Sequence, residues 1–94
     1  MSAIHQLTAG FTLGDAITNE ARALRDHFLS WGHESKIYSE RASIHPDLRG
    51  EAGEAEECLR TVQPEDTVLL HLSIGSGIND LFPRLPCRKA IMYH

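Results

Sequence analysis

The sequence predicts one α/β domain over residues 1–94, with an open parallel sheet of about four strands and helices on both faces. Two observations carry this prediction. The first third of the chain has the pattern of a strand, a glycine-bearing loop, an amphipathic helix and a second strand, which indicates a parallel pair with a right-handed crossover. Residues 67–72 form a continuous apolar run, as is typical of a central parallel strand covered on both faces.

The first crossover can be placed residue by residue. Residues 3–8 form the predicted first strand, and residues 34–40 form the second. Between them, Asp15 is a suitable N-cap for a helix that begins at Ala16, and Gly32 is a suitable C-terminal stop. An apolar stripe at helical spacing follows this helix, formed by Ile17, Ala21, Leu24, Phe28 and Trp31.

The rest of the chain shows weaker patterns. Residues 41–66 are polar and acidic, and we expect a solvated loop and a short surface helix at 55–62 rather than a site. A short helix is predicted within residues 78–85, and an apolar strand at 89–93. Because such a last strand leaves an open edge, we expect an N-terminal portion of a longer protein, or pairing with another chain, and self-association of the chain by itself.

Composition excludes several classes of function. The formal charge is -4 and the nine Lys and Arg residues are scattered, which argues against nucleic-acid binding. The two cysteines form no C-x-x-C pair, so a reduced, cytoplasmic setting is expected. No apolar run approaches the roughly 20 residues that span a bilayer. The six histidines show no metal-ligand spacing, and we expect no metal site.

The predicted topology also places a site. If the first strand lies between the second and the third, the strand order reverses beside it, as in Rossmann-like sheets, and ligands bind at the carboxyl ends there. The loops at this point are residues 9–14 and 73–77, both rich in small residues. His71 and His94 belong to the same edge. We therefore expect the site between these two loops.

Known local motifs do not explain these loops. Gly10-x-x-x-Gly14-Asp15 is neither a dinucleotide fingerprint nor a Walker loop, and a tight turn with positive φ accounts for its glycines as well as a phosphate contact does. Residues 71–75 have the spacing of a nucleophile elbow, but His71 replaces the first glycine. A polar loop before a helix is the favoured interpretation of that stretch.

Four stretches, in order, resemble the N-terminal half of family-four glycosyltransferases: Ile4-His5-Gln6-Leu7, Gly14-Asp15-Ala16-Ile17, His71-Leu72-Ser73-Ile74-Gly75-Ser76 and Lys89-Ala90-Ile91-Met92-Tyr93-His94. The resemblance implies a GT-B arrangement, in which this acceptor-side domain faces a C-terminal domain that holds most of a nucleotide-diphosphate sugar. It further implies transfer that is usually retaining and metal-independent, with no cofactor beyond the donor. The 94 residues alone would then not turn over substrate.

The resemblance also implies roles for single residues. Those expected to approach the donor phosphates and sugar are Thr12, Leu13, Gly14 and Asp15. The residue expected to touch the transferred sugar during catalysis is His94, and those expected to line the acceptor cleft are His71, Ser73 and Gly75. If the acceptor is a lipid, peripheral membrane contact follows. The alternative is a free-standing flavodoxin-like or Rossmann-like module that binds a ligand or partner without catalysis.

Overall fold

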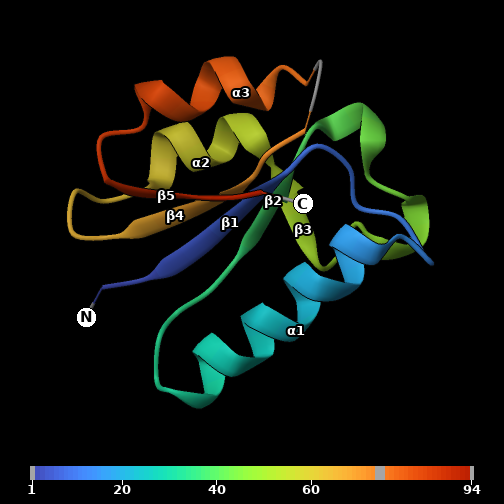
Figure 1. The fold of residues 1–94 in the computed structure, drawn as a ribbon, viewed down its shortest axis with the longest axis horizontal. Coiled ribbons are helices and arrows are strands. Elements are labelled where there is room, and N and C mark those ends of the chain that lie inside the picture. Colours follow the sequence, from blue (N-terminus) through green and yellow to red (C-terminus); the bar gives the residue numbers. More distant parts are fainter. Residues whose placement is uncertain (1, 74–75, 94) are drawn as a thin grey trace.

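The computed structural model describes residues 2–73 and 76–93. Over these residues the chain forms a five-stranded parallel sheet with the order β3-β2-β1-β4-β5. The strands are β1 (Ile4–Thr8), β2 (Ile37–Ser39), β3 (Ala52–Glu54), β4 (Thr67–His71) and β5 (Arg88–Met92). Helix α1 (Ala16–Ser30) covers one face, and α2 (Ala55–Thr61) and α3 (Ile78–Leu81) cover the other (Figure 1). The predicted fold class and the reversal of strand order beside β1 are confirmed.

The fifth strand, β3, was not predicted, and the expectation of a loop and a helix over residues 41–66 is wrong in this respect. The segment also holds two 3₁₀ helices, η1 (Arg41–Ser43) and η2 (Pro46–Leu48). β3 carries no β-branched or aromatic residue, so its pattern gives no strand signal. Its glycine has a packing reason: a Cβ on Gly53 would lie 3.0 Å from the ring of Tyr38 on β2.

The ends of α1 confirm the predicted caps, whereas its buried face differs from the predicted stripe. Asp15 caps the helix by accepting a hydrogen bond from the Thr18 N–H at 2.8 Å, and Gly32 follows the helix with a φ of 88°. The buried residues of α1 are Thr18 and Ala21, while Trp31 is 68% exposed. The C-terminal turn of α1 projects below the sheet (Figure 1), and the ring of Trp31 contacts the rings of His27 and Phe28 of the same helix.

Each face of the sheet has its own apolar core. On the side of α2 and α3 the core is built around Leu7, Val68 and Leu70, and it includes Cys58 of α2. Burial raises the pKa of the Cys58 thiol to about 12, so this cysteine stays protonated at neutral pH and acts as a small apolar residue. On the side of α1 the buried set is Phe11, Ala21, Ile37, Ile44 and Leu48.

The edge formed by β5 is open, since β4 is the neighbour with which it pairs in the sheet. Ile91 and Tyr93 at this edge are exposed. This arrangement agrees with the expectation of an uncovered last strand, while self-association stays a prediction. Among the described residues, no helix has the length and apolar character required to cross a bilayer.

Candidate functional site

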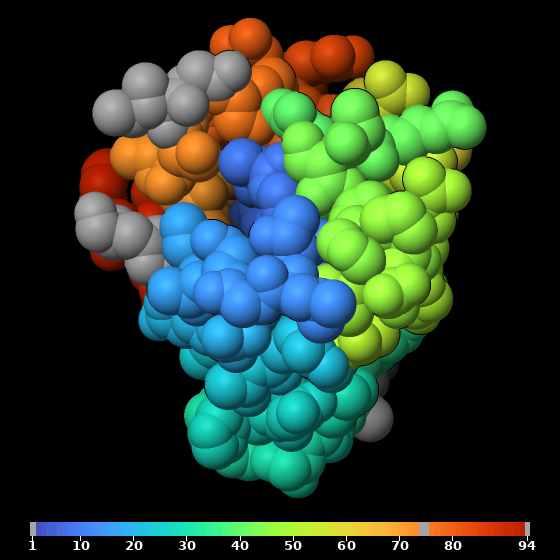
Figure 2. Space-filling view, turned by 90° about the vertical axis from the view of Figure 1, so that its right-hand side faces the viewer, coloured from blue at the N-terminus to red at the C-terminus, as the bar shows by residue number. Residues whose placement is uncertain are grey.

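A pocket of about 180 Å³ lies at the carboxyl ends of β1 and β4, where the strand order reverses. We call it the switch-point pocket, and its lining residues are Ala9, Gly10, Thr12, Asp15, Ile17, His71 and Ser73. Figure 2 looks onto this edge of the molecule: the loop after β1, in blue, lies between the segment after β4, in orange, and the η1 region, in green. The two loops expected to form a site are thus brought together.

The start of α1 forms one wall of this pocket. The Asp15 carboxylate accepts hydrogen bonds from the Thr18 N–H at 2.8 Å and the Thr18 hydroxyl at 3.0 Å. The same hydroxyl oxygen accepts the Thr12 N–H at 3.1 Å, which ties the loop to the helix. The N–H groups of Ala16 and Ile17 belong to the first turn, where no intrahelical acceptor exists. They lie at the positive end of the helix dipole, which favours an anion.

Gly14 gives the loop its shape just before the cap. Its φ is 77°, in the left-handed region that side chains other than glycine rarely adopt. No heavy atom lies within 4 Å of a Cβ built on this residue, so the backbone conformation, and not the space, requires glycine here. The turn explanation of Gly14 is confirmed; whether the residue also approaches a phosphate stays a prediction.

A buried polar chain runs beneath the pocket. His71 is 1% exposed, and its Nε2 lies 2.7 Å from Oε1 of Gln6 on β1. The Gln6 amide nitrogen donates to the Ala21 carbonyl of α1 at 2.8 Å. A carbonyl can only accept, so the Gln6 amide must point its nitrogen at α1 and its oxygen at His71. The His71 ring therefore carries a proton on Nε2.

Phe11 anchors the loop that forms the pocket. Its side chain is fully buried in the core on the α1 side of the sheet, although the residue lies outside any strand. Its N–H donates to the Ser43 carbonyl at 3.0 Å, and its carbonyl accepts the His45 N–H at 2.8 Å. These bonds continue the parallel pairing beyond β1, through a bridge between Phe11 and Ile44. The loop after β1 is thus fixed to the region after β2.

The predicted site residues divide into three groups. Thr12, Asp15, His71 and Ser73 line the switch-point pocket. Leu13 and Gly14 lie in the same loop with exposed positions and do not line the pocket. Gly75 and His94 lie outside the described residues, so their roles stay predictions.

Five contributors to the site had no predicted role of their own, although three of them lie in the loop 9–14 that was expected to form it: Gln6, Ala9, Gly10, Phe11 and Ile17. A glutamine within a predicted buried strand was the available signal for Gln6, because a buried amide requires partners. Phe11 gave a weaker signal, as an aromatic residue in a loop. Nothing in the sequence marked Ile17 as a lining residue.

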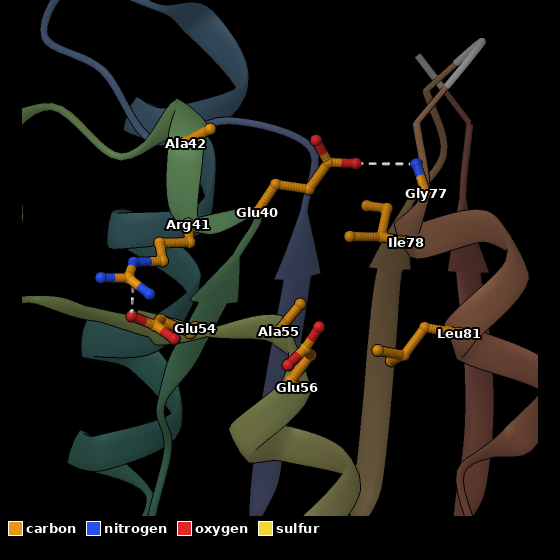
Figure 3. A pocket seen from close by; sticks show the side chains of 9 residues that line it. All are labelled: Glu40, Arg41, Ala42, Glu54, Ala55, Glu56, Gly77, Ile78 and Leu81. Carbon is orange, nitrogen blue, oxygen red and sulfur yellow. Dashed lines mark hydrogen bonds and ion pairs between the residues drawn. The ribbon is translucent and has the colours of Figure 1, made fainter.

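A larger pocket, of about 440 Å³, opens at the same edge between the end of β2 and the starts of α2 and α3 (Figure 3). We call it the acidic pocket, because its lining includes three carboxylates and one guanidinium: Glu40, Glu54, Glu56 and Arg41. The guanidinium of Arg41 pairs with Glu54 at 3.3 Å. Excess negative charge disfavours an anion here, so the smaller switch-point pocket is the better candidate for a phosphate. The expectation of no site in residues 41–66 stays a prediction, although Arg41, Glu54 and Glu56 of that segment line this pocket.

The buried histidine of β1, His5, belongs to a hydrogen-bonded cluster away from both pockets. His5 is buried at the amino edge of the sheet, where its Nδ1 accepts the Lys36 N–H at 3.1 Å and its Nε2 lies 3.8 Å from Asp66. Burial lowers the pKa of His5 more than the Asp66 carboxylate raises it, and the Lys36 bond also requires a lone pair on Nδ1. Within residues 2–73 and 76–93, no cluster of three or more potential metal ligands occurs.

Comparison of the chain with protein-family models, with curated proteins and with solved structures gives no match. The resemblance to glycosyltransferases therefore rests on the four sequence stretches alone.

Proposed function

We propose that this chain is the acceptor-side domain of a nucleotide-sugar glycosyltransferase, and that the switch-point pocket receives the diphosphate end of the donor. The observation that supports this most is that two of the four motif stretches meet at one pocket. Asp15 and Ile17 at the start of α1 lie far in sequence from His71 and Ser73 at the end of β4, and these residues line the same space. A C-terminal domain closing over this edge, retaining transfer and a cytoplasmic setting belong to the same proposal.

The chemistry of the pocket suits the departure of a diphosphate. When the bond between sugar and phosphate breaks, negative charge grows on the leaving diphosphate. The first-turn N–H groups of Ala16 and Ile17 are fixed donors at a helix start, and they stabilise such charge without moving. These N–H groups stabilise negative charge on the diphosphate, which is a role that a bound metal ion has in other enzymes.

The opposite wall suits hydroxyl groups of a sugar. His71 and Ser73 line the pocket, and an imidazole and a hydroxyl are groups that can form hydrogen bonds with sugar hydroxyls. The proton on His71 Nε2 is held by Gln6, so the ring orientation is fixed before a ligand arrives. In the complete enzyme we expect His94 to touch the transferred sugar.

Substitution of Asp15 tests this assignment through charge. Asp15→Asn retains an oxygen that can accept the Thr18 N–H, and it removes a negative charge from the pocket wall. We expect the variant to bind uridine diphosphate glucose about two- to fivefold more tightly, the size of a screened charge effect at a helix start. Affinity is measured by titration of the chain and followed through amide shifts in an NMR spectrum.

The matched control is Asp26→Asn, which removes an exposed carboxylate on α1 that pairs with Arg25. This control should leave the affinity unchanged. Equal or weaker binding by Asp15→Asn would contradict a diphosphate at this wall. Donor binding by the full-length protein without any sugar transfer would instead favour the non-catalytic binding module.

A further inference from the structure

Glu40 connects two loops that lie on opposite sides of β1. It follows β2 directly, and its backbone is fixed by the start of η1, where the Glu40 carbonyl accepts the Ser43 N–H at 2.9 Å. Its carboxylate Oε1 accepts the Gly77 N–H at 2.7 Å, and it also accepts the Ser76 hydroxyl. Figure 3 shows the Glu40 side chain extending past the end of β1 to reach Gly77.

These contacts organise the start of α3 around one carboxylate oxygen. The Ser76 hydroxyl donates to Glu40, and its oxygen accepts the Ile78 N–H at 3.3 Å. A Cβ on Gly77 would lie 3.4 Å from the same carboxylate oxygen, so the approach of the two segments is close. Hydrogen bonds to an ionised carboxylate are about twice as strong as neutral ones, so the bonds from Ser76 and Gly77 to Glu40 connect the end of β2 firmly to the start of α3.

The contact between Glu40 and the start of α3 is connected to the switch-point pocket through Asn79 of α3. Asn79 lies in the first turn of α3, two residues after Gly77, and its side-chain nitrogen donates to the Ser73 carbonyl at 2.5 Å. Ser73 lines the switch-point pocket, whereas Glu40 lines the acidic pocket. Through its carboxylate, Glu40 can therefore act on the switch-point pocket by fixing where α3, and through it Ser73, is placed.

We propose that Glu40 is the positioning residue of the switch-point pocket: its carboxylate holds the start of α3 against β2 and so fixes Ser73 for ligand binding. This rests on the proposed function for the identity of the ligand, a diphosphate. The placement of Ser73 itself does not depend on that identity.

The test compares Glu40→Ala with Glu40→Gln in the 94-residue chain. Gln keeps an oxygen that can accept from Gly77 and Ser76, whereas Ala removes it. We expect Glu40→Ala to speed hydrogen exchange of the Gly77 amide by about ten- to a hundredfold, the effect of losing a charged hydrogen bond, and Glu40→Gln to recover most of the protection. The Asn79 side-chain amide signals should shift in the Ala variant, while exchange in β1 and β4 stays as in the parent chain.

The same variants are then titrated with inorganic pyrophosphate. We expect weaker pyrophosphate binding by Glu40→Ala and near-parent binding by Glu40→Gln. Removal of the negative charge alone would strengthen anion binding, so weaker binding by the Ala variant would show that Ser73 is no longer held in place. Glu56→Ala, which removes another carboxylate of the acidic pocket, is the matched control and should show no loss. Unchanged Gly77 exchange in Glu40→Ala would overturn the inference, as would equal or tighter pyrophosphate binding by that variant.

Failure of the proposed function gives a different result. If pyrophosphate causes no amide shifts near Thr12 in the parent chain, the diphosphate proposal fails. The Gly77 exchange and the Asn79 side-chain signals then still decide whether Glu40 positions Ser73.

Discussion

Phe11→Ala is expected to lower the free energy of unfolding by about 3–5 kcal/mol, a large part of the stability of a domain of this size. The Phe11 ring is fully buried beside Ile37 and Ile44, and its removal leaves a cavity beneath the loop that forms the switch-point pocket. Because the same loop carries Thr12 and Gly14, donor binding should be lost together with stability. Urea denaturation followed by circular dichroism measures the change.

Two variants in the same loop calibrate this result. Phe11→Leu keeps most of the apolar volume and should cost on the order of 1 kcal/mol. Leu13→Ala removes an exposed side chain two residues away and should change stability by no more than about 0.5 kcal/mol. If Phe11→Ala is no more destabilising than Leu13→Ala, the loop is not anchored as we describe.

Gln6→Leu is expected to cost about 1–3 kcal/mol although it places an apolar residue in the interior. The Gln6 side chain is fully buried, and its oxygen accepts the proton of His71 Nε2. Leucine leaves that buried N–H without this acceptor, and the cost of the lost hydrogen bond exceeds the gain from apolar burial. Stability is again measured by urea denaturation.

A double-mutant cycle measures the interaction energy between Gln6 and His71. His71→Leu alone should cost a similar amount, because it removes the donor to the Gln6 oxygen. The double variant Gln6→Leu with His71→Leu should cost clearly less than the sum, since neither side of the bond is then left behind. Strict additivity would show that the 2.7 Å contact contributes nothing to the fold.

The strand–loop–helix unit at the start of the chain was predictable because its signals are local. Asp15 has the chemistry of an N-cap, and Gly14 and Gly32 occupy the two positions where φ is positive among the described residues. The run at residues 67–72 has the apolar continuity that a covered parallel strand requires. These elements, with the handedness of parallel crossovers, suffice to place the reversal of strand order and the pocket above it.

The parts that escaped prediction depend on contacts distant in sequence. β3 is a strand because its backbone pairs with β2 and because Tyr38 packs over Gly53, neither of which leaves a local pattern. Trp31 fits the helical stripe but is exposed at the C-terminal end of α1. Glu40 bonds to Gly77, a residue 37 positions further along, so its role appears only in the folded chain.

The most direct test of a donor site at the switch-point pocket is a map of amide shifts upon titration of the chain with uridine diphosphate glucose and, separately, guanosine diphosphate mannose. For at least one donor, we expect weak binding with the largest shifts at Thr12, Gly14, Asp15, Ile17 and Ser73. Shifts centred on Glu54 and Glu56 of the acidic pocket, or no shifts with either donor, would contradict the proposal.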